Sequence, residues 1–346
     1  MPLDTYAKFC EQGFSEPFFR GNGTPQGPYL VTFCLAGEQL GYGCGAIASL
    51  ITLSTFLNRL VLTLLADPVR SELRPQLSGG PFVTAFAASE RAAGSDLLGL
   101  ATRAERCDGG YVLNGRKEYS SNLRHASRVI VVARTGKGRS SDALSWFLVP
   151  TDQPGVRIGE RWPTLGLRSM DLSPLELTNV AVPASHRVGD EGRGMRLMNE
   201  SLSQSRTTIA AIAVGVARRA RDEVLSFGAK RVLYGEKLYK MQDYRFQIAE
   251  MEADIAAAQA LVYLSALKYD QGGDHTKEAS IAKLYAGQMV MRVTQAASLM
   301  LGAVGYTGQS VTEKLFRDAR HTAIVEGTEP THKEIVFASL LRRGGY

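Results

Sequence analysis

The spacing of apolar residues changes twice along the chain of 346 residues. Residues 35–77 carry apolar side chains at helical spacing, whereas residues 81 to about 190 form short β-branched runs separated by Gly, Asp, Ser and Pro. Amphipathic runs return at about 197–228, 241–270, 276–302 and 311–320, and from about 330. This order predicts an α+β chain with an N-terminal helical domain (1–80), a central, mostly antiparallel β-domain (81–190) and a C-terminal helical bundle (191–346).

An uncharged stretch at 41–57 raises the question of a membrane span. It falls short of the roughly 20 apolar residues that cross a bilayer, and Asn58 and Arg59 interrupt it, so a buried helix is expected. The start of the chain, MPLDTYAKFCEQ, has neither the basic start nor the apolar core of a signal peptide. The four cysteines show no CxxC spacing. We therefore expect a cytoplasmic protein with reduced thiols and no membrane span.

The net charge of +6 excludes only some classes of binding partner. Basic residues are dispersed and form no cluster with aromatic residues, so no nucleic acid is expected. A small molecule bearing several phosphates, an acidic carrier protein, or a merely basic surface fits equally well. The five histidines lack the spacing of metal ligands, and no metal is expected. His321 and His332 flank Glu326, and a surface or packing role is expected for both.

Two segments of the β-domain contain small and hydroxyl residues. The segment SERAAGSD (89–96) offers the hydroxyls of Ser89 and Ser95 and exposed N–H groups, which suit a phosphate or a carbonyl-rich ring, or form an ordinary turn. In KEYSSN (117–122), Tyr119 and Ser121 point to the same side of a strand. They offer a flat surface and a hydrogen bond to a ring system, or an ordinary cross-strand pair. The dipeptide Asn114-Gly115 predicts a hairpin turn ahead of that strand.

Glu326 lies in the segment IVEGTEPTHKE (324–334), between an apolar pair and Gly-Thr. A carboxylate at the edge of an apolar segment has a raised pKa because it is desolvated, and a general base for a carbon acid needs such a pKa near neutral pH. In the alternative interpretation Glu326 caps a helix, with Thr328 as N-cap and Pro330 at an early helical position. Arg206, at the polar start of an apolar helix, could pair with an acidic group or shape the site beside Glu326.

Five segments, in this order and at near-constant spacing, resemble the acyl-CoA dehydrogenase family over residues 30–346. FAASERAAGSD resembles the family's TEPGAGSD, and DGGYVLNGRKEYSSN resembles YVLNGxKxWITN. The stretch from SRTTIAAIAVGVARRA to FQIAEM is similar to the family's R…GxA…RxxFGxxLxxxQ…LAdM pattern. KLFRDAR and the following VEGTEP resemble kLyRDar and iyEGT.

The resemblance implies FAD bound between the β-domain and the bundle, usually in a homotetramer (or a homodimer) whose neighbouring subunit completes the site. It implies α,β-dehydrogenation of an acyl-CoA or acyl-carrier-protein thioester, with an electron-transfer flavoprotein or another acceptor taking the electrons. Glu326 corresponds to the catalytic base, which removes the α proton while the flavin accepts the β hydride. The alternative is a flavin-dependent monooxygenase or oxidase on the same fold; a non-catalytic binding subunit is a third reading.

The same resemblance assigns further residues to the site. Those that correspond to cofactor-binding positions are Phe86, Ala88, Ser89, Gly94, Ser95, Tyr119, Ser121, Arg231, Tyr234, Gln242, Gly302, Ala303 and Thr328. Of these, Arg231, Tyr234 and Gln242 correspond to residues that contact FAD from a neighbouring subunit. The positions that correspond to the substrate site are Ser95, Arg206, Val325 and Gly327.

The sequence departs from the family pattern at several of these positions. Val325 replaces the aromatic residue that usually precedes the glutamate, which reshapes the acyl pocket. Pro330, His332 and Lys333 replace the usual Q-x-Q-R, Leu299 replaces a glutamine, and Arg91-Ala92 replaces Pro-Gly. Little sequence precedes the helix expected at 36–66, so we expect one or two family helices to be missing or recast and the site to be open enough for a carrier-protein substrate.

Overall fold

The computed structural model describes residues 3–14 and 29–344, and the chain forms two compact units. The sheet unit contains helix α1 (Leu3–Glu11) and the ranges Leu50–Thr164 and Arg168–Ser201. The helix unit contains Pro28–Ser49, Leu165–Leu167 and Leu202–Tyr346. The expected class, α+β with helical regions before and after the strands along the chain, is confirmed. The three domains, with boundaries expected at 80 and 190, stay a prediction.

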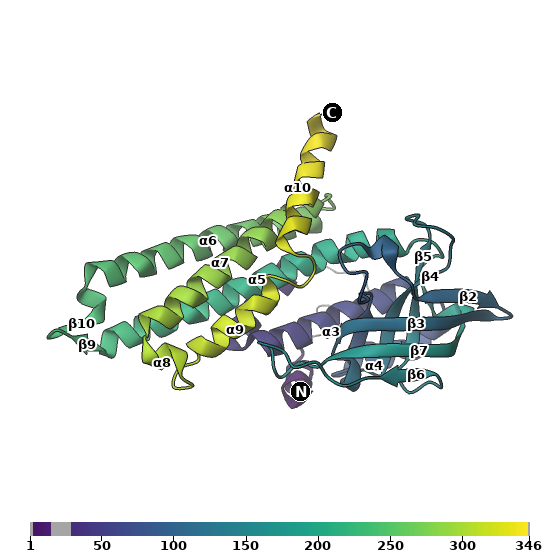
Figure 1. The fold of residues 1–346 in the computed structure, drawn as a ribbon, viewed down its shortest axis with the longest axis horizontal. Coiled ribbons are helices and arrows are strands. Elements are labelled where there is room, and N and C mark those ends of the chain that lie inside the picture. The colour runs from purple at the N-terminus through teal and green to yellow at the C-terminus, as the bar shows by residue number, and fades with distance from the viewer. Residues whose placement is uncertain (1–2, 15–28, 345–346) are drawn as a thin grey trace. The chain divides into compact units, whose positions relative to one another are not determined.

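One mixed sheet of eight strands forms the centre of the sheet unit (Figure 1). Its strands run in the order β6-β7-β3-β1-β4-β5-β8, and β2 pairs with both β3 and β4. Pairing is antiparallel except where β4 meets β1 and β2, so the sheet is mostly antiparallel, as expected. The strands are β1 (Thr84–Ala87), β2 (Arg103–Cys107), β3 (Gly110–Ser121), β4 (Arg128–Arg134), β5 (Leu144–Pro150), β6 (Val156–Ile158), β7 (Leu172–Pro183) and β8 (Arg187–Val188).

The core of the sheet unit lies along β4 and β5, whose apolar runs are buried on both faces. Trp146 on β5 packs edge-on against Phe86 on β1 at 5.1 Å, and Phe147 packs edge-on against Tyr111 at 4.8 Å. This unit also contains α4 (Val69–Gly79) and the single 3₁₀ turns η2 (Leu97–Gly99), η3 (Leu123–His125) and η4 (Ala184–His186).

The hairpin turn expected at Asn114-Gly115 is wrong, because both residues lie inside the continuous strand β3. The register against β7 shifts between Leu113 and Gly115, so the dipeptide forms a bulge. Gly115 has φ 152°, and a Cβ there would lie 2.5 Å from Thr102 Oγ1. Position 115 therefore requires glycine, because the backbone of β3 passes close to Thr102. The turn that joins β2 to β3 is Asp108-Gly109, an equally good turn sequence six residues earlier.

The uncharged stretch near residue 50 forms α3 (Gly45–Leu64). Among the described residues it is the one helix long and apolar enough to cross a membrane. However, 78% of its most apolar window is buried inside the protein, as in the core helix of a globular fold. The expectation of a buried helix is therefore confirmed, with the break from the preceding helix α2 (Tyr29–Gly43) at Cys44.

The helix unit contains the long helices predicted from the amphipathic runs (Figure 1). These are α5 (Gly194–Lys230), which enters the unit at Leu202, α6 (Gln242–Asp270), α7 (Thr276–Met300), α9 (Thr312–Thr322) and α10 (Glu329–Gly344). A short helix that was not predicted, α8 (Ala303–Tyr306), lies between α7 and α9. A small hairpin of β9 (Val232–Leu233) and β10 (Glu236–Lys237), followed by η5 (Leu238–Lys240), joins α5 to α6. The helix α7 packs against α6, α9 and α10.

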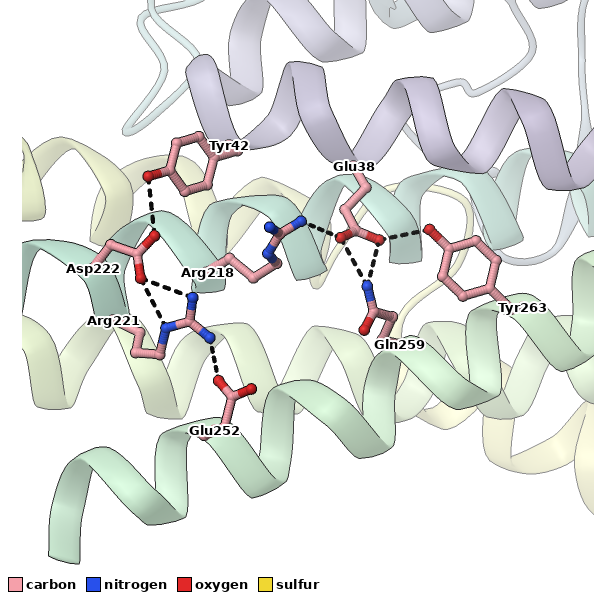
Figure 2. Close-up of polar contacts among 8 residues, drawn as sticks. All are labelled: Glu38, Tyr42, Arg218, Arg221, Asp222, Glu252, Gln259 and Tyr263. Carbon is pink, nitrogen blue, oxygen red and sulfur yellow. Dashed lines mark hydrogen bonds and ion pairs between the residues drawn. The ribbon is translucent and has the colours of Figure 1, made fainter.

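A buried carboxylate joins α2 to two helices of the bundle (Figure 2). Glu38 on α2 accepts hydrogen bonds from Arg218 on α5 and from Gln259 and Tyr263 on α6, the last at 2.8 Å. At the same crossing, a Cβ on Gly215 would lie 2.0 Å from the backbone oxygen of Glu38. The two helices thus approach as closely as a glycine allows, and the buried charge is matched by donors from both partners.

Candidate active site

Glu326 lies in the connection between α9 and α10, in a backbone conformation that few residues adopt. Its φ is 61°, in the left-handed region, and that of the following Gly327 is 115°. The amides of Ile324 and Val325 donate to the backbone oxygen of His321, which ends the helix just ahead of this segment. A non-glycine residue in this region carries strain of order 1 kcal/mol, and such residues concentrate at functional sites.

Two neighbouring residues of α5 hold Glu326 in this conformation. The buried guanidinium of Arg206 donates from Nε to the backbone oxygen of Glu326 at 3.0 Å. The hydroxyl of Ser205 donates to its carboxylate Oε1 at 2.8 Å. Backbone and side chain are therefore fixed separately, so the carboxylate points in a defined direction. The expectation that Arg206 lies beside Glu326 agrees with this geometry.

His332 on α10 supports the same segment from the other side. Its Nε2 lies 2.9 Å from the backbone oxygen of Gly327, an acceptor, so Nε2 carries the proton. The ring is buried, and desolvation, with the charges of Lys283 and Arg206, lowers the pKa of His332 to about 3. His332 is thus a neutral residue that fixes the loop, in line with the packing role expected for it.

The electrostatic balance at Glu326 favours a carboxyl group with a raised pKa. Burial raises the pKa of Glu326, while the hydrogen bond from Ser205 and the charges of Arg206 and Lys283 offset only part of that rise. Lys283 projects from α7 and is itself buried, which lowers its own pKa to about 8 despite the attraction of Glu326. This partly buried carboxylate therefore meets the physical requirement for a general base near neutral pH.

Sequence reasoning did not single out Ser205 or Lys283. For Lys283 a signal exists: it interrupts a helical stripe of small residues, Ala279, Ala282 and Ala286, and a lysine on the buried face of a helix needs a reason. For Ser205 the sequence offers no comparable signal, because serine at the polar start of a helix is common. Its role becomes visible only when the fold brings residue 205 beside residue 326.

The segment from Ala88 to Ser95 follows β1 in the sheet unit and is anchored by a buried ion pair. Lys117 on β3 donates to the backbone oxygen of Ala88 at 2.9 Å and to Glu90 Oε1 at 2.8 Å. Burial alone would raise the pKa of Glu90, but Lys117 and the donors of Thr102 and Ala101 outweigh it and lower that pKa. The loop that carries Ser89, Gly94 and Ser95 is thus tied to β3, while Gly94 and Ser95 themselves stay exposed.

Tyr119 and Ser121 lie on β3, whose end pairs with β1. Ser121 pairs in register with Phe86, and Tyr119 sits where the β3–β7 register shifts, with φ 58°. Its ring is 55% exposed and tilted against Trp162 at 5.9 Å. An exposed aromatic ring on a bulged strand, close to a hydroxyl, fits the flat face and polar edge of an isoalloxazine ring.

The remaining predicted residues lie in the helix unit. Arg231 follows α5, Gln242 begins α6, and Tyr234 forms the β9–β10 turn with Gly235, both at positive φ, with its ring 93% exposed. Gly302 (φ 58°) and Ala303 begin α8 and are exposed. Val325 and Thr328 flank Glu326 and Gly327 in the α9–α10 connection. The structure thus brings together Arg206, Val325, Glu326, Gly327 and Thr328 within one unit.

Within the part of the chain that the structure describes, no cluster of three His, Cys, Asp or Glu residues could hold a metal.

Comparison with known proteins places this geometry in a family. Residues 85–180 match the middle domain of acyl-CoA dehydrogenase, and residues 192–341 match its C-terminal domain. The probable acyl-CoA dehydrogenase YngJ of Bacillus subtilis is 31% identical over 344 residues, which cover 99% of this chain and 90% of that protein.

Solved structures agree. Butyryl-CoA dehydrogenase from Megasphaera elsdenii superposes with a TM-score of 0.93 at 29% identity, covering 98% of this chain and 90% of that one. The prolyl acyl carrier protein oxidase AnaB superposes with a TM-score of 0.91 at 26% identity, covering 98% and 91%. The expected oxidoreductase class, acting on CH–CH bonds, and the expected cofactor FAD are confirmed for the family. Because two domains of the family match and the B. subtilis relative is covered over 90% of its length, the chain belongs to the acyl-CoA dehydrogenase family.

Proposed function

We propose that the protein dehydrogenates an acyl thioester between its α and β carbons, with Glu326 as the base that removes the α proton. The observation that carries this proposal is the way Glu326 is held: a strained backbone fixed by Arg206, a carboxylate fixed by Ser205, and a raised pKa. A carboxylate used only to cap a helix would need none of these.

The proton beside a thioester carbonyl becomes acidic only when charge on the carbonyl oxygen is stabilised. The backbone N–H of Glu326 donates to no acceptor among the described residues, and it is rigidly placed because Arg206 holds the adjoining oxygen. We infer that this N–H donates to the thioester oxygen while the carboxylate takes the proton. A preorganised donor of this kind is worth about 3 kcal/mol in the transition state.

FAD supplies the acceptor for the hydride that leaves the β carbon. In this proposal Tyr119 and Ser121 line the ring, and Phe86, Ala88, Ser89, Gly94 and Ser95 form the adjoining loop, which the Lys117–Glu90 ion pair keeps in place. Arg231, Tyr234 and Gln242 would reach FAD of a second subunit, in line with the exposure of the Tyr234 ring. Gly302, Ala303 and Thr328 complete the predicted cofactor contacts.

The acyl carrier is either CoA or an acyl-carrier protein. The B. subtilis and M. elsdenii proteins are named for CoA thioesters, and AnaB is named for a prolyl carrier protein. Val325, Gly327, Ser95 and Arg206 are the proposed substrate contacts. An electron-transfer flavoprotein as acceptor, a homotetramer or homodimer, and a cytoplasmic location remain predictions.

Anaerobic titration of the purified FAD-loaded protein tests the proposal. Saturated acyl-CoAs and the corresponding acyl-carrier proteins are added one at a time while the flavin absorbance near 450 nm is followed. We expect one class to bleach the flavin, and Glu326→Gln to abolish bleaching with FAD still bound. Glu329→Gln, three residues away on α10, serves as the matched control and should bleach normally.

Two outcomes would overturn the proposal. Bleaching that persists in Glu326→Gln would remove the glutamate from its assigned role. A protein that no acyl thioester bleaches, but that consumes oxygen once chemically reduced, would support the monooxygenase or oxidase reading. The name of AnaB, an oxidase on the same fold, gives that reading its support.

A further inference from the structure

Lys283 is a buried cation for which the fold provides no direct partner. Its side chain is 2% exposed, among the largest fully buried side chains of the protein. Among the residues that the structure describes, none accepts a hydrogen bond from its Nζ or lies within ion-pair distance of it. An unpaired ammonium in the interior costs several kcal/mol, so a nearby negative charge must compensate it or the group must serve a purpose.

The position of Lys283 on α7 identifies that charge. This helix packs against α9 and α10, the two helices that the Glu326 segment connects. Gly287 lies one turn after Lys283 on the same buried face, and a Cβ there would lie 3.4 Å from the backbone of Ala323. The face of α7 that carries Lys283 therefore packs against the stretch that leads from α9 into Glu326.

The groups that act on Lys283 or Glu326, or on which Lys283 acts, come from three neighbouring helices. Helix α5 contributes Arg206 and Ser205, α9 contributes His321, and α10 contributes His332. Lys283 acts electrostatically on Glu326 and on both histidines, and burial together with this charge lowers the pKa of His321 to about 4 and that of His332 to about 3. Asp318 on α9 opposes the effect on His321 only. Both rings are neutral at pH 7, so among these groups Glu326 is the anion on which two cations, Arg206 and Lys283, act.

We propose that Lys283 is a positioning residue of the proposed reaction, whose buried ammonium keeps the partly buried Glu326 carboxylate ionised. The inference deepens the proposed function and rests on it. Arg206 acts on the same carboxylate through its own charge and also holds the backbone oxygen of Glu326, and Lys283 supplies a second cation. Lys283 contributes only its positive charge. A nearby positive charge favours the ionised form of a carboxylate whose buried surroundings favour the neutral acid.

Replacing Lys283 by methionine removes the charge and keeps the length and apolar character of the side chain. The burial that raises the pKa of Glu326 then meets less opposition, so we expect its titration to move upward by about one pH unit. Activity should fall about tenfold below the new midpoint and recover at higher pH. A merely structural role would lower activity equally at every pH.

The first readout needs no substrate. Carbon-13 NMR of the FAD-loaded protein labelled with [5-¹³C]glutamate follows the carboxyl titration of Glu326, assigned by the signal lost in Glu326→Gln. We expect a higher midpoint in Lys283→Met and an unchanged one in Lys277→Met. Lys277 is a partly exposed cation on the same helix, paired with Glu278 at 3.6 Å, and serves as the matched control. Lys283→Gln replaces the methionine variant if that one does not fold.

The second readout is the pH profile of kcat/KM with the acyl thioester that bleaches the flavin. An acidic limb that shifts upward in Lys283→Met, but not in Lys277→Met, supports the inference. An unchanged Glu326 titration in the NMR experiment overturns it, whatever the activity shows. A shifted titration in a protein that no acyl thioester bleaches would instead mean that the proposed function fails while the electrostatic coupling stands.

Discussion

Arg206 donates from Nε to the backbone oxygen of Glu326 at 3.0 Å, so helix α5 holds the main chain of the proposed base. This contact explains how a glutamate remains at φ 61° without a glycine's freedom. It also separates two tasks that a single ion pair would combine: the arginine places the residue, and Ser205 orients the carboxylate. The direction of the base is thus set by two adjacent residues of one helix.

Arg206→Lys keeps the charge but loses this hydrogen bond, because an ammonium group cannot reproduce the planar guanidinium geometry. We expect kcat/KM to fall about 10- to 100-fold with FAD still bound, as for a displaced catalytic group. Arg219→Lys, at a surface pair with Glu223 on the same helix, should leave kcat/KM unchanged. Steady-state kinetics of the two variants and the parent protein measure this difference in kcat/KM. Equal activity of Arg206→Lys and the parent would show that the backbone contact does not matter.

Glu326→Gln should stabilise the protein at alkaline pH. Because burial raises the pKa of Glu326 above its ordinary 4.5, the folded state holds this proton more tightly than the unfolded chain. The group's contribution is complete below pH 4.5 and is lost as the pH rises through the folded value. At pH 8 we therefore expect the glutamine variant to gain about 1 kcal/mol in free energy of unfolding, measured by urea titration.

The matched control, Glu329→Gln, should change the free energy of unfolding in the opposite direction. Hydrogen bonding to Lys333 and Gln288 lowers the pKa of Glu329, so its carboxylate stabilises the fold above pH 4.5 and that stabilisation is lost as the pH falls. Glu329→Gln should lower the urea midpoint at pH 8. A gain in Glu329→Gln, or a loss in Glu326→Gln, would contradict the electrostatics described for this segment.

The buried pair Lys117–Glu90 should behave as a coupled unit. Lys117→Met leaves the carboxylate of Glu90 buried with only Thr102 and Ala101 as donors, and we expect a loss of about 3–5 kcal/mol in stability. The double variant Lys117→Met/Glu90→Gln leaves no unpaired charge and should lose less than the lysine variant alone. Urea unfolding of the two single variants and the double variant gives the coupling energy. Additive losses would show that the pair is not coupled.

Gly215→Ala tests the close crossing of α2 and α5. The added methyl group would meet the backbone oxygen of Glu38 at 2.0 Å, so a helix must move, and we expect a loss of about 2 kcal/mol or more in stability. Gly43→Ala, at the end of α2 with nothing within 4 Å of the added carbon, should be neutral or slightly stabilising. Thermal unfolding of both variants compares them. A neutral Gly215→Ala would mean that the two helices can separate at no cost.

The helices could be predicted from the sequence because their cause is local. The amphipathic runs gave α5, α6, α7, α9 and α10 with bounds close to those observed, since a periodicity of 3.6 is a property of the segment itself. The hairpin turn predicted at the wrong position shows the limit of prediction from local sequence. Asn114-Gly115 and Asp108-Gly109 are both good turn sequences, and only the approach of Thr102 to Gly115 decides between them.

The site could be predicted only in part, for the same reason. Glu326 and Arg206 were identified by the resemblance to a family and by the local chemistry of their segments. Ser205 and Lys283 act on Glu326 from positions 121 and 43 residues earlier, and no local pattern encodes such a contact. The strain at Glu326 is equally invisible in the sequence, because glutamate is an unfavourable choice for φ 61° and is held there by its neighbours.

The carboxylate of Glu38 has a consequence for the order in which the protein is made. Its partners Arg218, Gln259 and Tyr263 lie 180 to 225 residues later in the chain. At roughly 5–20 residues per second, on the order of 10–40 s pass on the ribosome before the last of them is synthesised. During that time the Glu38 carboxylate on α2 has no partners with which it could be buried. Helix α2 can therefore pack into the helix unit only after most of the chain has been synthesised.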